Sequence, residues 1–165
     1  FGNLVSKHSH FNHANFSPSG KSILFFLVDT FNQKRKILLF HFKLKSKKIT
    51  FIEKIENISH YCWIDDKKIL FTQLQNNGIS KYKTYDIQKK KIDEIKLNLS
   101  LDGHPMVNPK NSDLFVTDTY PDKYGYQKLF VFFISFSTIL IFPESPKELE
   151  NICESYNSSK ICNVW

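Results

Sequence analysis

Three segments of the chain share one order of polar and apolar positions. Each begins with a histidine, has a bulky apolar residue three positions later, and passes through a polar turn into an apolar run. The segments cover residues 13–25, 60–71 and 104–116, so the histidines are spaced by 47 and 44 residues. A repeat of about 40–50 residues is typical of β-propeller blades, each of which is a four-stranded sheet.

Short apolar and alternating stretches inside each repeat predict four antiparallel strands. The predicted strands cover residues 11–16, 23–28, 36–42 and 50–55, then 61–64, 69–74, 81–86 and 91–95, then 105–107, 114–119, 128–134 and 138–142. We therefore predict an all-β fold of about three four-stranded antiparallel β-propeller blades in an incomplete ring. The blades span about residues 11–55, 58–96 and 102–142.

The repeat pattern stops near Pro143. We predict a partial β-propeller over residues 1–143 and an irregular or short helical tail over residues 144–165, with a helix near 146–153. Propellers contain about 4–8 blades, so three blades do not close a ring, and an open set exposes apolar blade faces. Missing blades or self-association are therefore expected to complete the structure.

The charge balance is basic, with a formal net charge of +7. The cations gather in small clusters at residues 33–36, 45–48 and 89–91, all at predicted turns or loops. Such clusters are typical of solvated turns, and a binding face for a polyanion is the alternative. A nucleic-acid partner is disfavoured because no recognition helix, RNP-type motif or zinc-finger spacing is present.

Two further features concern the cellular setting. The three cysteines, Cys62, Cys153 and Cys162, are unclustered, which favours a reducing cytoplasm over a disulfide framework or a zinc knuckle. The longest apolar run covers 14 residues, 129–142, and is shorter than the roughly 20 needed for a membrane-spanning helix. Two buried strands joined by a tight turn are the better interpretation, so no membrane span is expected.

Strand polarity places the three repeated histidines together. The start of a first strand and the end of a second strand lie on the same face of a blade, and first strands line the central channel. His13, His60 and His104 are therefore candidate ligands of a divalent metal of the Mn²⁺ type, a role suited to imidazoles. The alternative is a repeat consensus in which each histidine bonds to a neighbouring blade.

The third repeat adds polar residues to this rim. His104, Asp118 and Tyr120 are candidate catalytic residues for acid–base chemistry on a sugar acid. The loop that follows supplies candidate substrate-binding residues, namely Asp122, Tyr124 and Gln127. The same Asp and Pro residues are ordinary in turns, so a loop-capping role is the alternative.

Two motifs carry a family resemblance. The sequence from Asn12 to Gly20 resembles the "NHxxWSPDG" blade opening of oligogalacturonate-lyase-like, Tol-type propellers. Residues 102–105 with 117–122 are similar to the "DGHPxxSPD…TDTYPD" blade of that group, and the resemblance covers roughly residues 8–134. It implies a seven-bladed ring, a Mn²⁺-type ion on His and Gln ligands, and a His base for β-elimination from a uronate.

The resemblance leaves two functions open. One is a metal-dependent polysaccharide lyase linked to bacterial polysaccharide metabolism, expected to be inactive as this partial chain alone. The other is a non-catalytic propeller scaffold that binds a glycan or a protein. An acidic oligosaccharide or polysaccharide is the expected partner in the glycan cases.

Overall fold

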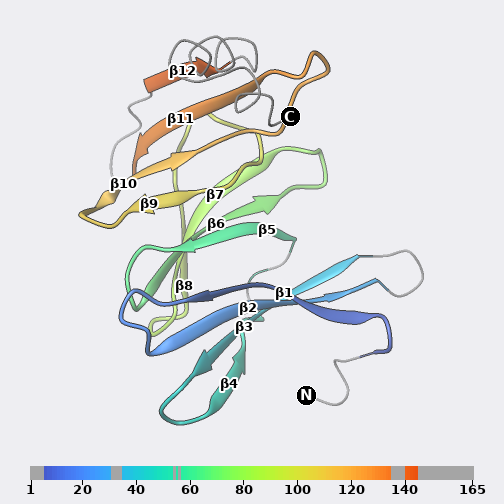
Figure 1. Ribbon diagram of the computed structural model, residues 1–165, viewed down its shortest axis with the longest axis vertical. Coiled ribbons are helices and arrows are strands. Elements are labelled where there is room, and N and C mark those ends of the chain that lie inside the picture. Colours follow the sequence, from blue (N-terminus) through green and yellow to red (C-terminus); the bar gives the residue numbers. More distant parts are fainter. Residues whose placement is uncertain (1–5, 31–34, 54, 56, 135–139, 145–165) are drawn as a thin grey trace, which may run out of the picture.

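The computed structural model describes residues 6–30, 35–53, 55, 57–134 and 140–144. These residues form twelve strands and, within the described ranges, no helix. The strands make three four-stranded sheets, each an antiparallel meander in which neighbours in sequence are neighbours in space. The sheets are stacked one after another along the long axis of the molecule (Figure 1).

Each sheet corresponds to one predicted blade. Blade one contains β1 (Ser9–Phe16), β2 (Ser22–Asp29), β3 (Lys36–Lys43) and β4 (Lys48–Phe51). Blade two contains β5 (Ile58–Trp63), β6 (Lys68–Leu74), β7 (Ser80–Asp86) and β8 (Lys91–Glu94). Blade three contains β9 (Met106–Asn108), β10 (Asn111–Thr117), β11 (Gln127–Phe133) and β12 (Leu140–Glu144). The predicted all-β fold with three blades is confirmed.

Turn chemistry joins the strands as the sequence predicts at the first repeat. The Gly20 backbone N–H donates to the Ser17 carbonyl at 2.8 Å, which closes the turn between β1 and β2. Gly20 has a φ of 70°, a conformation that glycine adopts without the steric cost of a Cβ atom. The turn therefore depends on glycine at this position.

Several strand bounds differ from the prediction, and two of the differences affect the core and the apolar run. Strand β4 ends at Phe51 rather than near residue 55, because the chain turns inward there. That turn buries Ile52 and Ile55 in the core between blades one and two. Strand β12 spans Leu140–Glu144 rather than 138–142, in register with β11. The apolar run of residues 129–142 thus contributes two paired strands.

The cores lie between the sheets. Apolar side chains of blades one and two form one cluster, which includes Leu24, Leu39, Trp63 and Phe71. Blades two and three share a second cluster with Leu70, Phe115 and Phe132 at its centre. Because successive strand residues point to opposite faces, Leu70 serves one interface and Phe71 the other. Stacking therefore depends on apolar residues on both faces of the middle blade.

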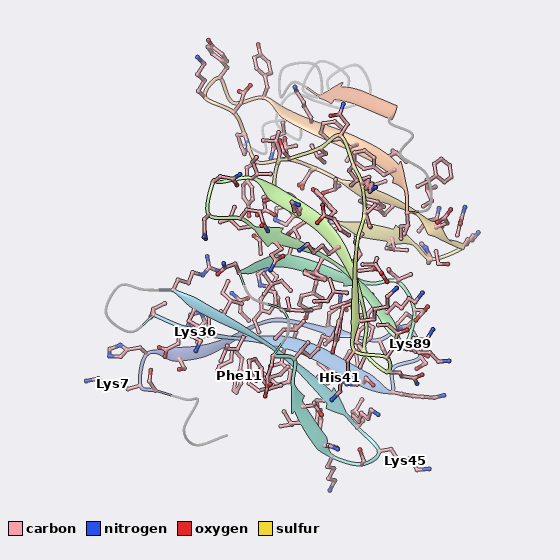
Figure 2. All side chains as sticks on the ribbon, turned by 180° about the vertical axis from the view of Figure 1, so that it is seen from behind. Lys7, Phe11, Lys36, His41, Lys45 and Lys89 are labelled. Atoms are coloured by element: carbon pink, nitrogen blue, oxygen red, sulfur yellow. The ribbon has the colours of Figure 1, made fainter. Side chains whose placement is uncertain are left out.

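Two of the three basic clusters lie in described turns, where the sequence predicts them. Lys45 and Lys89 occupy the turns that join β3 to β4 and β7 to β8, and both are exposed (Figure 2). Lys36, at the start of β3, is also exposed and lies at the other end of its strand from Lys45. Solvated turns therefore account for the clusters around Lys45 and Lys89.

Some predictions fall outside the described residues. The tail over residues 144–165 and its helix near 146–153 lie almost wholly beyond residue 144, so the division of the chain at residue 143 stays a prediction. Within the described ranges, no helix is long and apolar enough to cross a membrane.

Candidate functional site

The three repeated histidines lie in a row, one from each blade. The ring centres of His13 and His60 are 5.7 Å apart, and those of His60 and His104 are 4.3 Å apart. His13 and His60 each lie where the register of the inner strand shifts, between Asn12 and Asn15 in β1 and between Ile58 and Tyr61 in β5. These irregularities turn the histidine side chains out of the regular sheet alternation. We call His13, His60 and His104 the histidine row.

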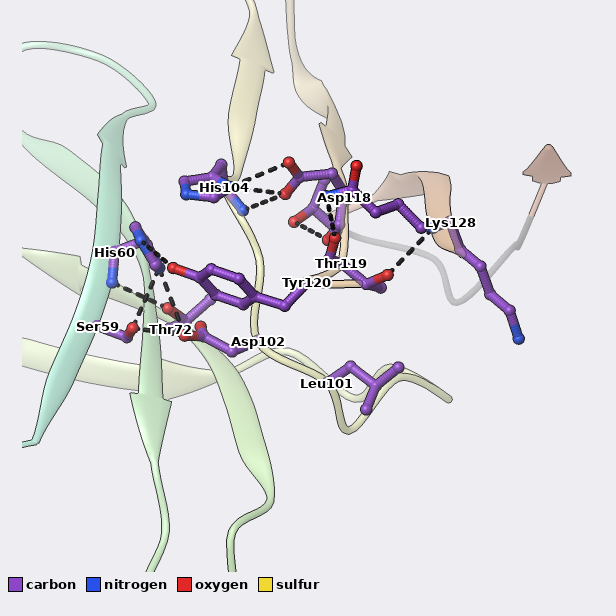
Figure 3. A network of polar contacts seen from close by, with 12 residues as sticks. Ser59, His60, Thr72, Leu101, Asp102, His104, Asp118, Thr119, Tyr120 and Lys128 are labelled. Carbon is purple, nitrogen blue, oxygen red and sulfur yellow. Dashed lines mark hydrogen bonds and ion pairs between the residues drawn. The ribbon is translucent and has the colours of Figure 1, made fainter. Parts of the chain in front are cut away.

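The middle histidine of the row is fixed by hydrogen bonds on both ring nitrogens (Figure 3). The Ser59 hydroxyl donates to Asp102 at 2.5 Å, so its oxygen is free to accept from His60 Nδ1 at 3.1 Å. The Tyr120 hydroxyl lies 3.3 Å from the His60 Nε2 atom, which accepts its proton. This order of donors places the ring proton of His60 on Nδ1. His60 is buried, so the chain of bonds holds its ring in one orientation.

Asp102 is the acidic end of this chain of bonds. It reaches from the loop before β9 into blade two, where its Oδ2 atom lies 3.5 Å from His60 Nδ1. Burial favours a higher pKa for the Asp102 carboxyl, but hydrogen bonds from His60, Ser59 and Thr72 outweigh burial and lower the pKa below its ordinary value. Its Oδ1 atom is buried and has no hydrogen-bond partner among the described residues.

The third histidine is paired with an aspartate of its own blade. His104 Nδ1 lies 2.9 and 3.0 Å from the two carboxylate oxygens of Asp118. The His104 backbone N–H also donates to Asp118, at 2.7 Å. Gly103 makes this approach possible, because a Cβ atom there would collide with the carbonyl oxygen of Asp118. Steric contact with Asp118 therefore explains why a glycine precedes His104.

Arg35 brings a fixed positive charge to the row. It lies just before β3 and lines the same cavity as His13. Burial lowers the pKa of His13, and electrostatic interactions with His60, Arg35 and His104 lower it further. Burial raises the pKa of the Tyr120 hydroxyl, the charges of Asp102 and Asp118 raise it further, and the charge of Arg35 opposes the rise. Arg35 thus adds positive charge beside a row whose other histidines already contact Asp102 and Asp118.

A cavity of about 1210 Å³ opens beside the histidine row. It is lined by all three histidines and by Arg35, Lys36, Glu53 and Tyr120, with apolar walls from blades one and two. Glu53 is the single carboxylate among its described lining residues. The cavity is larger than the 300–1,000 Å³ of ordinary small-molecule pockets, so it has room for an extended ligand.

The predicted substrate-binding residues lie apart from this cavity. The Asp122 carboxylate accepts the backbone N–H groups of Tyr124 and Tyr126 at 2.8 and 3.0 Å. The Gln127 side chain donates to the Thr119 carbonyl at 3.1 Å. Tyr124 is exposed at the tip of the loop, under the ammonium group of Lys123. Asp122 and Gln127 therefore shape the loop between β10 and β11, and none of the three predicted residues lines the cavity.

The metal prediction meets a chemical obstacle in this arrangement. Among the described residues, no group of three or more His, Cys, Asp or Glu side chains is placed to hold a metal ion. His60 uses both ring nitrogens in hydrogen bonds, and His104 uses Nδ1 with Asp118. The residues as arranged do not fit a Mn²⁺-type ion, and we derive no chemistry through one.

Three residues of the site are absent from the sequence-based set. Ser59 and Asp102 orient His60, and Arg35 charges the cavity. Asp102 stands beside the Gly-His-Pro motif, which was a usable signal. No sequence signal marks Arg35 as a site residue, because it is one of several cations in the cluster at residues 33–36. Position in the sequence did not separate it from its solvated neighbours.

Similarity to solved structures is clear at the level of the fold. The chain superposes on the β-propeller domain of the Trilobed protease from Pyrococcus furiosus with a TM-score of 0.62 at 16% identity, covering 84% of this chain and 44% of that one. TolB from Acinetobacter baumannii gives 0.61 at 14% identity, covering 82% and 33%. The acylaminoacyl peptidase from Pyrococcus horikoshii gives 0.67 at 13% identity, covering 84% and 26%.

These likenesses establish a propeller fold related in shape to TolB and to peptidase propeller domains. The chain spans less than half the length of each of these three proteins. The predicted Tol-type likeness is supported, whereas a specific likeness to oligogalacturonate lyases is not shown. No family model and no curated protein matches the sequence.

Proposed function

We propose that the chain is part of a non-catalytic β-propeller binding domain whose cavity takes a carboxylate-bearing oligosaccharide. The observation that carries this proposal is the lining of the cavity, where three histidines, Arg35 and Lys36 face one carboxylate, Glu53. A guanidinium group binds a carboxylate through two parallel hydrogen bonds, and cavities concentrate the field of their charges.

The side chains of the row favour binding over chemistry. Both ring nitrogens of His60 are occupied by hydrogen bonds with Ser59 and Tyr120, so its ring lines the cavity in a fixed orientation. Tyr120 is 53% exposed, which leaves its ring available to pack against a sugar face. The cavity volume suits several linked sugar units rather than one.

Calorimetric titration with an oligogalacturonate tests this function. The fully methyl-esterified oligomer is the matched control, because it keeps the backbone and removes the charge. We expect saturable binding of the acid and at least about tenfold weaker binding of the ester, since hydrogen bonds to charged groups contribute about 1.5–3 kcal/mol. Equal binding of both oligomers, or no saturable binding, would contradict the proposal.

Two variants connect the binding to the cavity. Arg35→Gln is expected to weaken binding of the acid at least about tenfold. Lys45→Gln removes the same charge from the exposed turn between β3 and β4 and is expected to leave affinity unchanged. An equal loss in both variants would mean that net charge, rather than the cavity, attracts the ligand.

A second candidate is the lyase reaction, which the pairing of His104 with Asp118 favours. Asp118 on Nδ1 leaves Nε2 of His104 as a base for the C5 proton of a uronate. The C5–H electron pair would form the C4=C5 bond, the C4–O bond would break, and the departing oxygen would take a proton from solvent. Growth of the ultraviolet absorbance of the unsaturated product, lost in His104→Gln, would establish it. No growth, with or without added Mn²⁺, excludes it for this chain.

A further inference from the structure

The repeats place equivalent residues at three successive blade positions, and their burial differs. Leu24, Leu70 and Leu114 are equivalent, as are Phe25, Phe71 and Phe115. Leu24 and Leu70 are 0% exposed because each packs against the next blade along the chain. Phe71 and Phe115 are 0% exposed because each packs against the blade before it. We call these two sides of a blade its trailing face and its leading face.

The leading face of blade one lacks the burial of its equivalents. Phe16 stands three positions after His13, as Trp63 stands after His60 and Val107 after His104. Phe16 is 59% exposed, whereas Trp63 and Val107 are 7% and 9% exposed.

The strand register supports the same equivalence. Phe16 pairs with Ile23 as Trp63 pairs with Ile69, so both aromatic rings occupy leading faces.

Part of that leading face is already covered. Leu27, Leu38 and Phe40 form a small buried cluster of their own. What remains open lies along the inner strand β1, where Phe11 is 63% exposed and Phe16 nearly as much. In β1 every residue after Ser9 is exposed, whereas the equivalent strand β5 is mostly buried under blade one. The exposed part of the leading face in blade one is therefore the part that, in blade two, packs against the preceding blade.

The trailing face of blade three shows the complementary gap. Leu114 is only half-buried, although its equivalents Leu24 and Leu70 are fully buried. Four further apolar residues share this face at similar exposure, namely Val116, Leu129, Val131 and Phe133. Blade three thus presents an apolar sheet face of the kind that blades one and two bury against their followers.

From these two faces we infer that two copies of this chain join head to tail into a closed six-bladed ring. The trailing face of blade three in one copy covers the leading face of blade one in the other, and the second contact closes the ring. Each chain carries both halves of the interface that it already uses twice internally. Two copies supply six blades, within the 4–8 that propellers contain, whereas three copies supply nine.

The oligomeric state tests this inference, by light scattering coupled to size-exclusion chromatography. We expect the chain to form a species of two copies. Phe16→Asp and Leu114→Asp should each shift it to single chains, because each places a carboxylate in both contacts. Leu44→Asp, at an exposed apolar residue in the turn between β3 and β4, should leave two copies associated. The first two side chains are exposed or half-buried, so circular dichroism should show an unchanged β fold in each.

Mixing the two single variants identifies the contact as head to tail. In a mixture, the intact trailing face of the Phe16→Asp chain meets the intact leading face of the Leu114→Asp chain. One wild-type contact is restored, and a species of two copies should reappear. A wild-type chain that stays single would overturn the inference and assign the faces to blades of a longer polypeptide. A second result would also overturn it: association lost in Phe16→Asp but retained in Leu114→Asp, and not restored by mixing. That result would indicate a dimer in which the leading faces of both copies contact each other.

Discussion

His104 Nδ1 and the Asp118 carboxylate form a two-point contact at 2.9 and 3.0 Å, at the mouth of the cavity beside the histidine row. The same carboxylate accepts the backbone N–H of His104. Asp118 therefore holds both the backbone and the imidazole ring of His104, just before β9 begins. This pair is the most directly testable element of the site.

Replacing Asp118 by alanine should free the ring of His104. In the wild type, the carboxylate holds the ring proton on Nδ1, whereas a free imidazole prefers the proton on Nε2. We expect the ring ¹⁵N chemical shifts of His104 to move toward the Nε2–H tautomer in Asp118→Ala. The cost in folding free energy should stay near 1 kcal/mol or below, because both side chains are more than a third exposed. Unchanged ¹⁵N shifts would mean that Asp118 does not set the tautomer.

Asp102 should make folding sensitive to acid. Its pKa in the folded chain lies below the ordinary value of 3.8, because hydrogen bonds to the carboxylate outweigh burial. Its contribution to stability is therefore complete above pH 3.8 and is lost as the pH falls through the lower, folded pKa. Asp102→Asn should lower the free energy of unfolding at neutral pH by about 1–3 kcal/mol.

The pH dependence separates this role from simple packing. Urea unfolding of the wild type and of Asp102→Asn at a series of pH values should show their stabilities converging below pH 3.8. A constant difference over the whole series would show that the charge of Asp102 contributes nothing.

Arg35 should control the protonation of His13. Burial and then electrostatic interactions with His60, Arg35 and His104 lower the pKa of His13 below 6.5. Arg35→Gln should raise that pKa, which an NMR titration of the His13 ring protons measures. Lys45→Gln, in a distant turn, should leave the pKa unchanged at the same ionic strength. A bound polyanion should also raise the pKa of His13, so the titration reports occupancy of the cavity.

The Tyr61 hydroxyl group should stabilise the contact between blades one and two. The Tyr61 O–H points at the carbonyl oxygens of Leu24, at 2.8 Å, and of His13. Burial raises the pKa of this phenol well above its ordinary value, so it stays a donor. Tyr61→Phe should lower the free energy of unfolding by about 1–3 kcal/mol, because a buried acceptor is left unpaired.

Tyr126→Phe is the matched control for that substitution. Tyr126 is 51% exposed in the loop between β10 and β11, so loss of its hydroxyl should change stability by less than about 0.5 kcal/mol. Equal effects of the two substitutions in urea unfolding would contradict the inter-blade role of Tyr61.

The fold was accessible from the sequence because each blade is specified locally. Continuous apolar runs mark β2 and β6, and the Ser-Pro-Ser-Gly turn closes the first hairpin. Strand polarity then brings His13, His60 and His104, one from each blade, to the same side of the stack, as the ring distances show. Where local signals weaken, as after Phe51, the predicted strand ran too long.

The hydrogen-bond partners in the site could not be predicted from local sequence patterns. The sequence predicts Asp122 and Gln127 as substrate-binding residues beside the histidines. In the structure, the Asp122 carboxylate accepts backbone N–H groups of its own loop, and the Gln127 side chain donates to the Thr119 carbonyl. Asp102, in contrast, crosses from the start of the third repeat to His60 in the second blade. Loop paths decide such partners, and a loop path depends on how whole blades stack.

The sequence by itself therefore determined the number of blades, their strands and the side of the stack along which the histidines lie. Those features follow from periodicities of two residues and of about 45, which short stretches of chain encode. The tertiary structure alone decided that Asp102 orients His60, that Arg35 lines the cavity, that Phe16 is exposed and that Leu114 is only half-buried. Each of these depends on how the strands fold and the blades stack, which brings together residues far apart in the sequence, and no local pattern records the pairing.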